Sequence, residues 1–254
     1  MCKLVSVIIP TYKRSDMLPR TIESVLNQSY KNVEILVIDD NNPDTQYRQL
    51  TEQMMLQFAN NPRVRYIKHK KNMNGSAARN TGIRNSSGDY LCFLDDDDYF
   101  IEKKLEKQVE FLDKYKQYDA VCCDYIKNNK KITLPVKEDY TRDILALYET
   151  PQTSGIMFRR SAVETIKGFD ESYIRHQDLE MLLRYFDAGF LMGKIDECLY
   201  IRDVSEVSNI PNGKKFEDVK KKFLSQFNYL IEKIDSKEPG FKKEVYTKHY
   251  ERIM

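Results

Sequence analysis

Four consecutive aspartates, Asp95 to Asp98, directly follow an apolar run at residues 89–94. Four adjacent negative charges repel one another, so a core strand that ends in them needs a cation or another compensating charge. Hard divalent cations such as Mg²⁺ and Mn²⁺ prefer oxygen ligands, and proteins often hold them with carboxylates together with substrate phosphates. The cluster therefore predicts a divalent metal site rather than a solvated acidic turn.

The four aspartates should not share one role. On an extended strand, Asp95 and Asp97 would point to one side, and Asp96 and Asp98 to the other. We expect Asp98 to support the turn that comes after the strand.

The composition narrows the class of protein. The chain has 254 residues, 41% hydrophobic and 31% charged, which suits one large soluble domain with at most a small appendage. A net charge of +2 gives no general attraction for nucleic acid. The five cysteines lack metal-knuckle or redox spacing, which indicates reduced thiols and a cytoplasmic setting. No run approaches the roughly 20 apolar residues that span a bilayer, so any membrane contact should be peripheral.

Strands and helices alternate along the first half of the chain. Apolar, β-branched runs predict buried strands at residues 4–9, 33–39, 63–69, 89–94 and 118–126. Helical spacing predicts helices at residues 45–59, 76–86 and 101–115, and another that Ser15 could cap. This alternation indicates crossover connections and a mostly parallel sheet.

Polar clusters lie directly after three of these strands, at residues 11–14, 39–44 and 95–98. In an open parallel sheet, ligands bind at the carboxyl ends of the strands. We therefore expect the three clusters to meet at one edge and form a ligand site. The glycine-rich phosphate loops of dinucleotide folds and P-loop proteins are absent, so a nucleotide would need another way to neutralise its phosphates.

An amphipathic helix is predicted at residues 176–190, with Asp178 in its first turn. An aspartate there often serves only the helix dipole, but it can also act as a general base. Glu180 is the nearest rival for that role. We expect His176 to be a polar loop residue rather than a metal ligand, because no second histidine lies nearby in the sequence.

Five segments together resemble glycosyltransferase family 2, whose members have the GT-A fold and invert the transferred sugar. They occur in the order and spacing of that family, across about residues 4 to 203. The segments are SVIIPTYKR (6–14), VEILVIDDNN (33–42), NGSAARNTGI (74–83), GDYLCFLDDDDYF (88–100) and HQDLEMLLRYFDAGF (176–190).

The resemblance implies a nucleotide-sugar site at the strand ends. Pro10, Thr11 and Tyr12 match the end of the first strand, where the family cradles the nucleobase. Arg14 is adjacent and implies a contact with the nucleotide, although family members often carry an acidic residue there. Two further residues match single positions of the family. Asp40 would contact uracil or its ribose, and Arg79 would lie near the nucleotide.

The resemblance also assigns the metal and the base. Asp95 and Asp97 match the outer positions of the family's D-x-D signature and would hold Mn²⁺ or Mg²⁺, with Asp97 as the direct ligand. Asp96 would lie near the ribose or the donor sugar. Asp178 matches the second residue of the family's Glu-Asp pair, which is the general base.

The sequence departs from the family at three points. Gln177 replaces the glutamate of the Glu-Asp pair, which removes a charge beside the base. Arg202 lacks the histidine that comes after this arginine in many members, so its closure over the diphosphate is a weaker expectation. Tryptophan is absent, so an aromatic platform for an acceptor sugar must come from tyrosine or phenylalanine. The candidates are Tyr99, Tyr125 and Tyr173.

These observations predict a GT-A catalytic domain at residues 1–213 and a helical C-terminal extension at residues 214–254. Within the domain, residues 1–100 would bind the nucleotide sugar and residues 101–213 the acceptor. The lysine-rich extension reads as an amphipathic helix that docks on the domain. Alternatively, its basic face would make peripheral contact with anionic lipids.

The expected activity is metal-dependent, inverting transfer of a sugar from a UDP-sugar to a glycan or a lipid-linked glycan. Family analogy places this reaction in bacterial surface-polysaccharide synthesis. Two alternatives stay open: a sugar-phosphate nucleotidyltransferase, which usually begins with a glycine-rich basic loop that SVIIPTYKR lacks, and a non-catalytic nucleotide-sugar-binding subunit.

Overall fold

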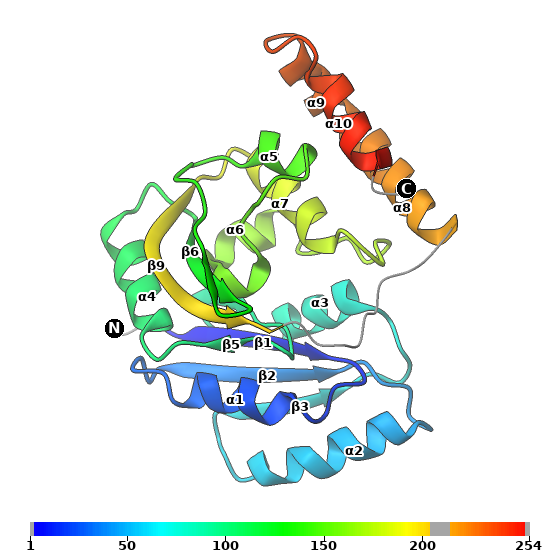
Figure 1. The fold of residues 1–254 in the computed structure, drawn as a ribbon. Coiled ribbons are helices and arrows are strands. Elements are labelled where there is room, and N and C mark those ends of the chain that lie inside the picture. The colour runs from blue at the N-terminus through cyan, green and yellow to red at the C-terminus, as the bar shows by residue number, and fades with distance from the viewer. Residues whose placement is uncertain (1–2, 204–213, 252–254) are drawn as a thin grey trace.

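A computed structural model describes residues 3–203 and 214–251, and its first half is the predicted parallel sheet (Figure 1). Four strands lie in the order β3-β2-β1-β4. Every residue of β4 and nearly every residue of β1 and β2 is buried, which explains their continuous apolar runs. The bounds are β1 Val5–Thr11, β2 Val33–Asp39, β3 Val64–Lys68 and β4 Tyr90–Phe93.

The helices between these strands also have the predicted order. They are α1 Leu18–Leu26, α2 Gln46–Met55, the short 3-10 helix η1 Leu56–Phe58 and α3 Gly75–Asn85. Helix α3 packs on β1 and β2. The expected Ser15 cap is wrong, because α1 begins two residues later, after Met17, where no side chain caps it and Pro19 occupies the first turn.

The second half turns the sheet into a mixed one. The strand order continues from β4 as β8-β6-β9-β5, with β7 paired to β6. Strand β8 is antiparallel to both β4 and β6, whereas β6 and β9 are parallel. These strands are β5 Tyr99–Phe100, β6 Ala120–Lys127, β7 Lys130–Ile132, β8 Met157–Arg159 and β9 Met192–Arg202. Strands of two or three residues carry too little periodicity to be found in the sequence.

Short helices connect the strands of the second half. They are α4 Lys104–Lys114, α5 Thr141–Leu145, the 3-10 helix η2 Thr153–Gly155, α6 Arg160–Thr165 and α7 Gln177–Asp187. Helix α4 packs on β6 and β9, and α5 packs on α7. The amphipathic helix predicted at residues 176–190 is therefore confirmed as α7.

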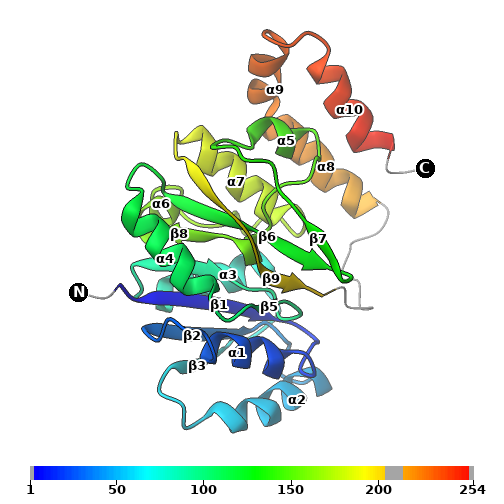
Figure 2. The ribbon, with the colours of Figure 1, turned by 60° about the vertical axis from the view of Figure 1, so that its left-hand side comes forward.

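Three helices replace the single one expected at the C-terminus. They are α8 Lys214–Gln226, α9 Asn228–Asp235 and α10 Phe241–Glu251. They form a projection beside α5 and α7 (Figure 2). The Tyr173 hydroxyl donates to Gln226 Oε1 at 2.8 Å, and Leu145 O accepts from His249 Nε2 at 3.0 Å. The extension thus docks on the catalytic part, in agreement with the first of the two expectations.

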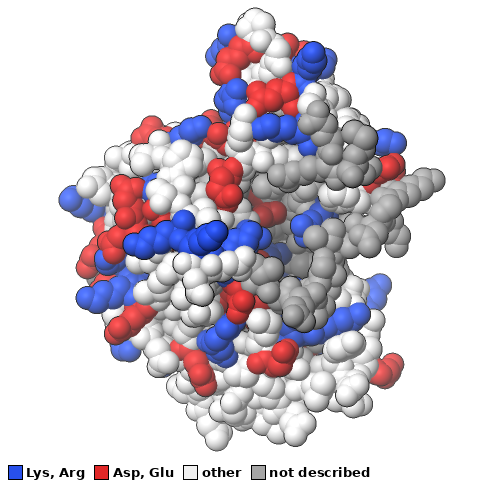
Figure 3. All heavy atoms as spheres, in the orientation of Figure 1, with Lys and Arg blue, Asp and Glu red and all other residues white. Residues whose placement is uncertain are grey.

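The surface gives a mixed charge pattern. Acidic and basic side chains are interspersed over the face shown in Figure 3, including the projection formed by the C-terminal helices. Among residues 3–203 and 214–251, no helix is both long and apolar enough to cross a bilayer. The four described cysteines are free thiols, as predicted, and they are Cys92, Cys122, Cys123 and Cys198.

Replacing Phe223 by alanine should destabilise the fold, because this side chain is fully buried where α8 meets the catalytic part. Its ring lies 5.6 Å from that of His176 and 5.7 Å from that of His249. Truncating a buried phenylalanine typically costs about 3 to 5 kcal/mol of the free energy of unfolding. Chemical denaturation monitored by circular dichroism measures the loss.

The matched control is Leu56→Ala, because Leu56 is 71% exposed. We expect it to change the free energy of unfolding by less than about 0.5 kcal/mol. Equal midpoints for Phe223→Ala and wild type would show that the extension does not pack as described.

Candidate functional site

The ends of β1, β2 and β4 meet at one edge of the sheet, as predicted. Thr11 Oγ1, at the end of β1, donates to Asp96 Oδ2 at 2.8 Å. The amide of Asp40, just after β2, donates to Thr11 O at 3.0 Å, and the Lys13 amide donates to Asn41 Oδ1 at 3.0 Å. Three segments that are distant in the sequence are thus joined by hydrogen bonds.

A pocket of about 210 Å³ opens at this junction, and we call it the strand-end pocket. Eight of the predicted site residues line it. The lining comprises Pro10, Thr11, Tyr12, Arg14, Asp40, Gly75, Ala78, Arg79, Asp95, Asp96 and Gln177. The structure thus brings together the residues that the sequence assigned to a nucleotide sugar.

Asp96 is the buried member of the aspartate run. Its carboxylate accepts from Thr11 Oγ1, from the Tyr12 amide at 3.3 Å and from Arg14 Nη1 at 3.1 Å. Burial raises the pKa of Asp96 to about 7, although the positive charge of Arg14 opposes this shift. Asp96 therefore holds the end of β1 in place.

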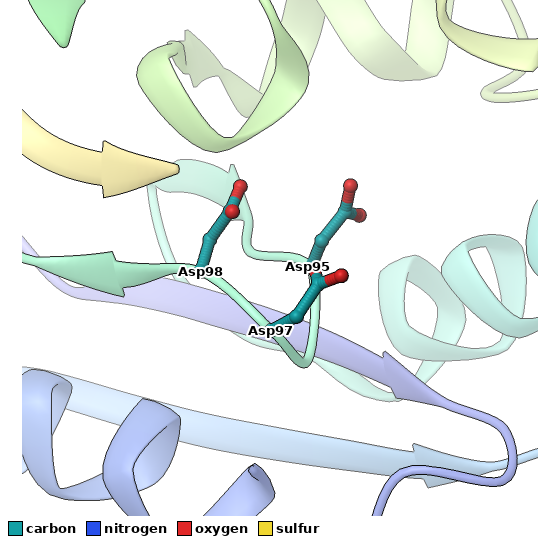
Figure 4. Close-up of side chains that lie close together, drawn as sticks. All are labelled: Asp95, Asp97 and Asp98. Carbon is teal, nitrogen blue, oxygen red and sulfur yellow. The ribbon is translucent and has the colours of Figure 1, made fainter. Parts of the chain in front are cut away.

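The other three aspartates form an acidic cluster. One carboxylate oxygen from each of Asp95, Asp97 and Asp98 lies within 4.8 Å of the others. Figure 4 shows the three side chains rising from the same side of the loop. The expectation that Asp98 points away from Asp95 and Asp97 is wrong, because the strand does not continue through these residues. Strand β4 ends at Phe93, and the Asp98 amide donates to Asp95 O at 3.0 Å, which forms a turn. A turn places side chains at i and i+3 together, which an extended strand cannot do.

Two arginines balance the cluster. Arg14 Nη1 lies 2.7 Å from Asp97 Oδ2, in addition to its contact with Asp96. Arg79 Nη2 lies 2.6 Å from Asp95 Oδ1. Arg14 therefore pairs with two carboxylates and also lines the strand-end pocket. Its expected contact with the nucleotide stays a prediction.

Asp98 has a different environment from its neighbours. It is 4% exposed, and its Oδ1 accepts from the Asp203 amide at 3.2 Å. Burial, together with the negative charge of Asp95, raises the pKa of Asp98 well above its usual range. Sequence reasoning left Asp98 out of the acidic cluster, and only the turn geometry places it there.

The donor set fits a hard divalent cation. Three close carboxylate oxygens are the ligand type that Mg²⁺ and Mn²⁺ prefer. Two of the three carboxylates are partly exposed, so they can be reached from solvent. The predicted metal ligands Asp95 and Asp97 thus lie together, with Asp98 as a third.

Asp40 lines the strand-end pocket, but its carboxylate is surrounded by protein donors. Oδ1 accepts from the Met73 amide at 2.7 Å and contacts His69 Nδ1 at 2.7 Å. Oδ2 accepts from Asn72 Nδ2 at 2.8 Å and from the Asn74 amide at 2.9 Å. Asp40 therefore shapes the loop that leads into α3, while its predicted contact with a base or ribose stays a prediction. The sequence reasoning missed His69, for which "HKKNMN" gave no signal.

Arg79 connects the acidic cluster to α7. Besides Asp95, it donates from Nη1 to Gln177 Oε1 at 3.0 Å. Gln177 in turn donates from Nε2 to Tyr173 O at 3.0 Å. The amide that replaces the family's glutamate thus accepts from Arg79 without adding a charge beside Asp178.

A second pocket, of about 510 Å³, lies at the start of α7, and we call it the α7 pocket. It shares Arg79, Asp95 and Gln177 with the strand-end pocket, so the two adjoin. Asp178 lines the α7 pocket, and no described residue in 3–203 or 214–251 donates a hydrogen bond to its carboxylate. A carboxylate without a protein donor is available to accept a proton from a bound molecule.

The rival base, Glu180, is not available in this way. It is fully buried, and its carboxylate receives hydrogen bonds from Arg184 at 2.6 Å and from Gln226 at 3.0 Å. It therefore holds α7 to its surroundings, and it does not line the α7 pocket.

His176 lies in the loop before α7, as predicted, where it is the N-cap residue and packs against α8. Its ring lies 5.9 Å from that of Phe216 and 5.6 Å from that of Phe223, both on α8. Burial lowers the pKa of His176 to about 4. Its backbone has φ 59°, a left-handed conformation that non-glycine residues rarely adopt.

The three expected aromatic platforms do not face the α7 pocket. Tyr125 and Tyr173 are buried, with 1% and 0% exposure, and the guanidinium of Arg20 covers the Tyr99 ring at 4.4 Å. The tyrosine that lines the α7 pocket with an exposed side chain is Tyr148. Its sequence context gave no signal, because α5 and the turn after it lack clear periodicity.

Comparison with known proteins agrees with the geometry. The model of the family "Glycosyl transferase family 2" matches residues 6–180. The amylovoran biosynthesis glycosyltransferase AmsB of Erwinia amylovora is 30% identical to this chain, over 95% of the chain and 80% of AmsB. The Escherichia coli UDP-Glc:alpha-D-GlcNAc-diphosphoundecaprenol beta-1,3-glucosyltransferase WfaP is 32% identical over 52% of the chain and 50% of WfaP.

A solved structure shows the fold. TarS of S. aureus, in complex with UDP-GlcNAc, superposes with a TM-score of 0.71 at 19% identity, over 86% of this chain and 64% of that one. The GT-A fold predicted from the sequence is therefore confirmed. Because the family model covers most of the chain, this protein belongs to glycosyl transferase family 2.

Proposed function

We propose that this protein transfers a sugar from a nucleoside diphosphate, with a UDP-sugar as the favoured donor, to an acceptor hydroxyl with inversion at the anomeric carbon. The observation that carries this proposal is the position of Asp178. Its free carboxylate lines a pocket that adjoins the strand-end pocket and the acidic cluster. Donor, base and acceptor can therefore meet at one boundary.

The strand-end pocket is the proposed donor site. Its lining includes Pro10, Thr11 and Tyr12 for the nucleobase and Arg79 for the negatively charged part of the nucleotide. TarS, which shares the fold, is described in complex with UDP-GlcNAc and also with UDP. These two structures support a uridine nucleotide as the first donor to test.

The acidic cluster is the proposed metal site, with Asp97 and Asp95 as ligands and Asp98 beside them. A divalent cation bound there would supply Lewis-acid stabilisation of the diphosphate leaving group. The protein's own cations, Arg14 and Arg79, lie on the same carboxylates and also line the donor site. They add positive charge where the leaving group develops negative charge.

Asp178 is the proposed general base. It accepts the proton of the acceptor hydroxyl while that oxygen bonds to the anomeric carbon. The bond from the anomeric carbon to the diphosphate oxygen breaks, and the electron pair leaves with the nucleoside diphosphate. Attack from the face opposite the leaving group in one displacement inverts the stereochemistry, without a covalent enzyme intermediate.

The proposed acceptor is a glycan or a lipid-linked glycan of a bacterial surface polysaccharide. AmsB is named for the synthesis of one such polymer, and the name of WfaP describes a lipid-linked acceptor. We place the reaction in the cytoplasm, where nucleotide sugars are made, with the basic C-terminal helices available for peripheral contact with anionic lipids.

Replacing Asp178 by asparagine should abolish the base without disturbing the donor site. We expect the transfer rate to fall by about 10²- to 10⁴-fold, the usual contribution of general base catalysis. Binding of UDP with MnCl₂, measured by isothermal titration calorimetry, should stay unchanged. The rate is measured by chromatography with the donor that a screen of nucleotide sugars identifies.

The matched control is Asp187→Asn, which makes the same change at an exposed position on the same helix. It should transfer at the wild-type rate. Full activity in Asp178→Asn would exclude Asp178 as the base. A wild-type protein that binds UDP but transfers none of the sugars screened would favour the non-catalytic alternative.

Replacing Asp97 by asparagine should remove metal-dependent donor binding. For the wild type, UDP and MnCl₂ at about 100 times the dissociation constant should raise the melting temperature by roughly 5 to 10 °C. We expect EDTA to cancel this rise and Asp97→Asn to lack it, because the cation loses a charged ligand. Differential scanning fluorimetry, with and without ligand for each variant, measures the shift.

Asp44→Asn is the control, because Asp44 is an exposed residue of the loop after β2 that does not line the strand-end pocket. It should keep the full shift. A rise that survives both EDTA and Asp97→Asn would show that the acidic cluster does not hold the metal.

A further inference from the structure

Helix α1 holds the backbone of the loop that carries the acidic cluster. The Thr21 hydroxyl lies 2.9 Å from Asp96 O and 2.8 Å from Asp98 O, the two loop carbonyls that it contacts. About one helical turn later, Ser24 Oγ accepts from the Phe100 amide at 3.1 Å. Thr21 is fully buried, so water does not compete for its hydroxyl. The loop is therefore fixed by a helix that lines neither the strand-end pocket nor the α7 pocket.

Arg20, on the same helix, connects this loop to a second segment. Its Nη2 donates to Asp97 O at 2.9 Å and pairs with Asp203 Oδ2 at 2.8 Å. The guanidinium group also covers the ring of Tyr99 at 4.4 Å. Asp203 comes directly after β9, which ends at Arg202. One planar side chain thus joins the loop of the acidic cluster to the end of β9.

The end of β9 in turn contacts the acidic cluster. The Asp203 amide donates to Asp98 Oδ1 at 3.2 Å, and Asp98 is the most buried of the three clustered carboxylates. The contacts form a closed circuit, because Arg20 contacts both Asp203 and the loop backbone. The circuit holds Asp98 where one of its oxygens lies within 4.8 Å of oxygens of Asp95 and Asp97.

Arg20 would affect a cation on the acidic cluster in two opposite ways. Its positive charge repels a cation, so charge alone predicts that removing Arg20 would tighten metal binding. Its contacts hold Asp98 beside the other two carboxylates, so position predicts that removing Arg20 would weaken metal binding. The side chains of Arg20 and Asp203 are 42% and 37% exposed, and their charges offset each other. Because water screens charges at such exposure, we expect the effect of position to be the larger one.

We propose that Arg20 is a positioning residue for the metal site, and that it holds the third carboxylate, Asp98, in place through Asp203. The proposal rests on the proposed function, because it concerns the cation that the acidic cluster would bind in that reaction. Arg20 lines neither pocket, so it acts only through the residues that it contacts. The metal site therefore extends to α1 and to the end of β9.

The test compares the full-length wild type with Arg20→Gln. MnCl₂ is titrated into each protein at a fixed excess of UDP, and differential scanning fluorimetry gives the half-saturating concentration of MnCl₂. Arg20→Gln should raise this concentration by about 10-fold or more, which is a typical cost of losing a residue that orients a metal ligand. Without MnCl₂ and UDP, its melting temperature should lie within about 4 °C of the wild type, because exposed ion pairs contribute little stability.

The matched control is Arg84→Gln, which breaks another exposed ion pair, with Glu171, and lies outside both pockets. It should keep the wild-type dependence on MnCl₂. Asp203→Asn should weaken metal binding as Arg20→Gln does. The double variant of Arg20 and Asp203 should bind no more weakly than either single variant, because each single change already breaks the same circuit.

Hydrogen exchange followed by mass spectrometry gives a second measurement, which needs neither metal nor nucleotide. In Arg20→Gln, peptides that cover residues 95–101 and the end of β9 should exchange faster than in the wild type, because their amides lose the contacts that keep them closed. The same peptides should exchange at the wild-type rate in Arg84→Gln.

Unchanged or tighter metal binding in Arg20→Gln would overturn the proposal, because it would show that the charge of Arg20 outweighs its position. That result leaves the proposed function intact, since the wild type would still gain stability from MnCl₂ with UDP. If the wild type gains none, the proposed metal site is wrong, and the role of Arg20 toward a cation is wrong with it. The proposed base is tested separately, by Asp178→Asn.

Discussion

The site depends on how the negative charge at the end of a buried strand is balanced. Leu94 has no exposed surface, and four carboxylates come directly after it. They are tolerated because positively charged side chains from other segments contact them. Arg14 comes from the loop after β1, and Arg79 comes from α3. Only parallel strands whose carboxyl ends meet at one edge bring these segments together. The parallel half of the sheet therefore positions the charges that balance the acidic cluster.

The same charge balance affects how a divalent cation and a donor would bind together. A divalent cation that joins Asp95 and Asp97 would share them with Arg79 and Arg14. Both guanidinium groups also line the strand-end pocket, where the phosphates of a donor would lie. When a cation binds the carboxylates, the two guanidinium groups can therefore pair with the phosphates instead. Asp96 also pairs with Arg14, but it is buried and keeps its hydrogen bond from Thr11.

The sequence was sufficient for features that depend on long periodic runs and on residues at strand ends. The four parallel strands, α7 and the convergence of the polar clusters were all predictable from these patterns. Features set by tertiary contacts were not predictable. The turn that adds Asp98 to the acidic cluster replaces strand alternation, and the donors around Asp40 come from a loop about 30 residues later. Tyr125 was a candidate platform by residue type, but packing buries it.

The position of the proposed base is determined from two sides. Gln177, directly before Asp178, is held by Arg79, so the start of α7 is tied to the acidic cluster. On the other side, Tyr173 and Glu180 both bond to Gln226 of α8. The left-handed backbone that begins α7 is thus enclosed between the strand-end pocket and the C-terminal helices. Because a small displacement of a base costs much of its catalytic effect, α8 belongs to the scaffold of the site.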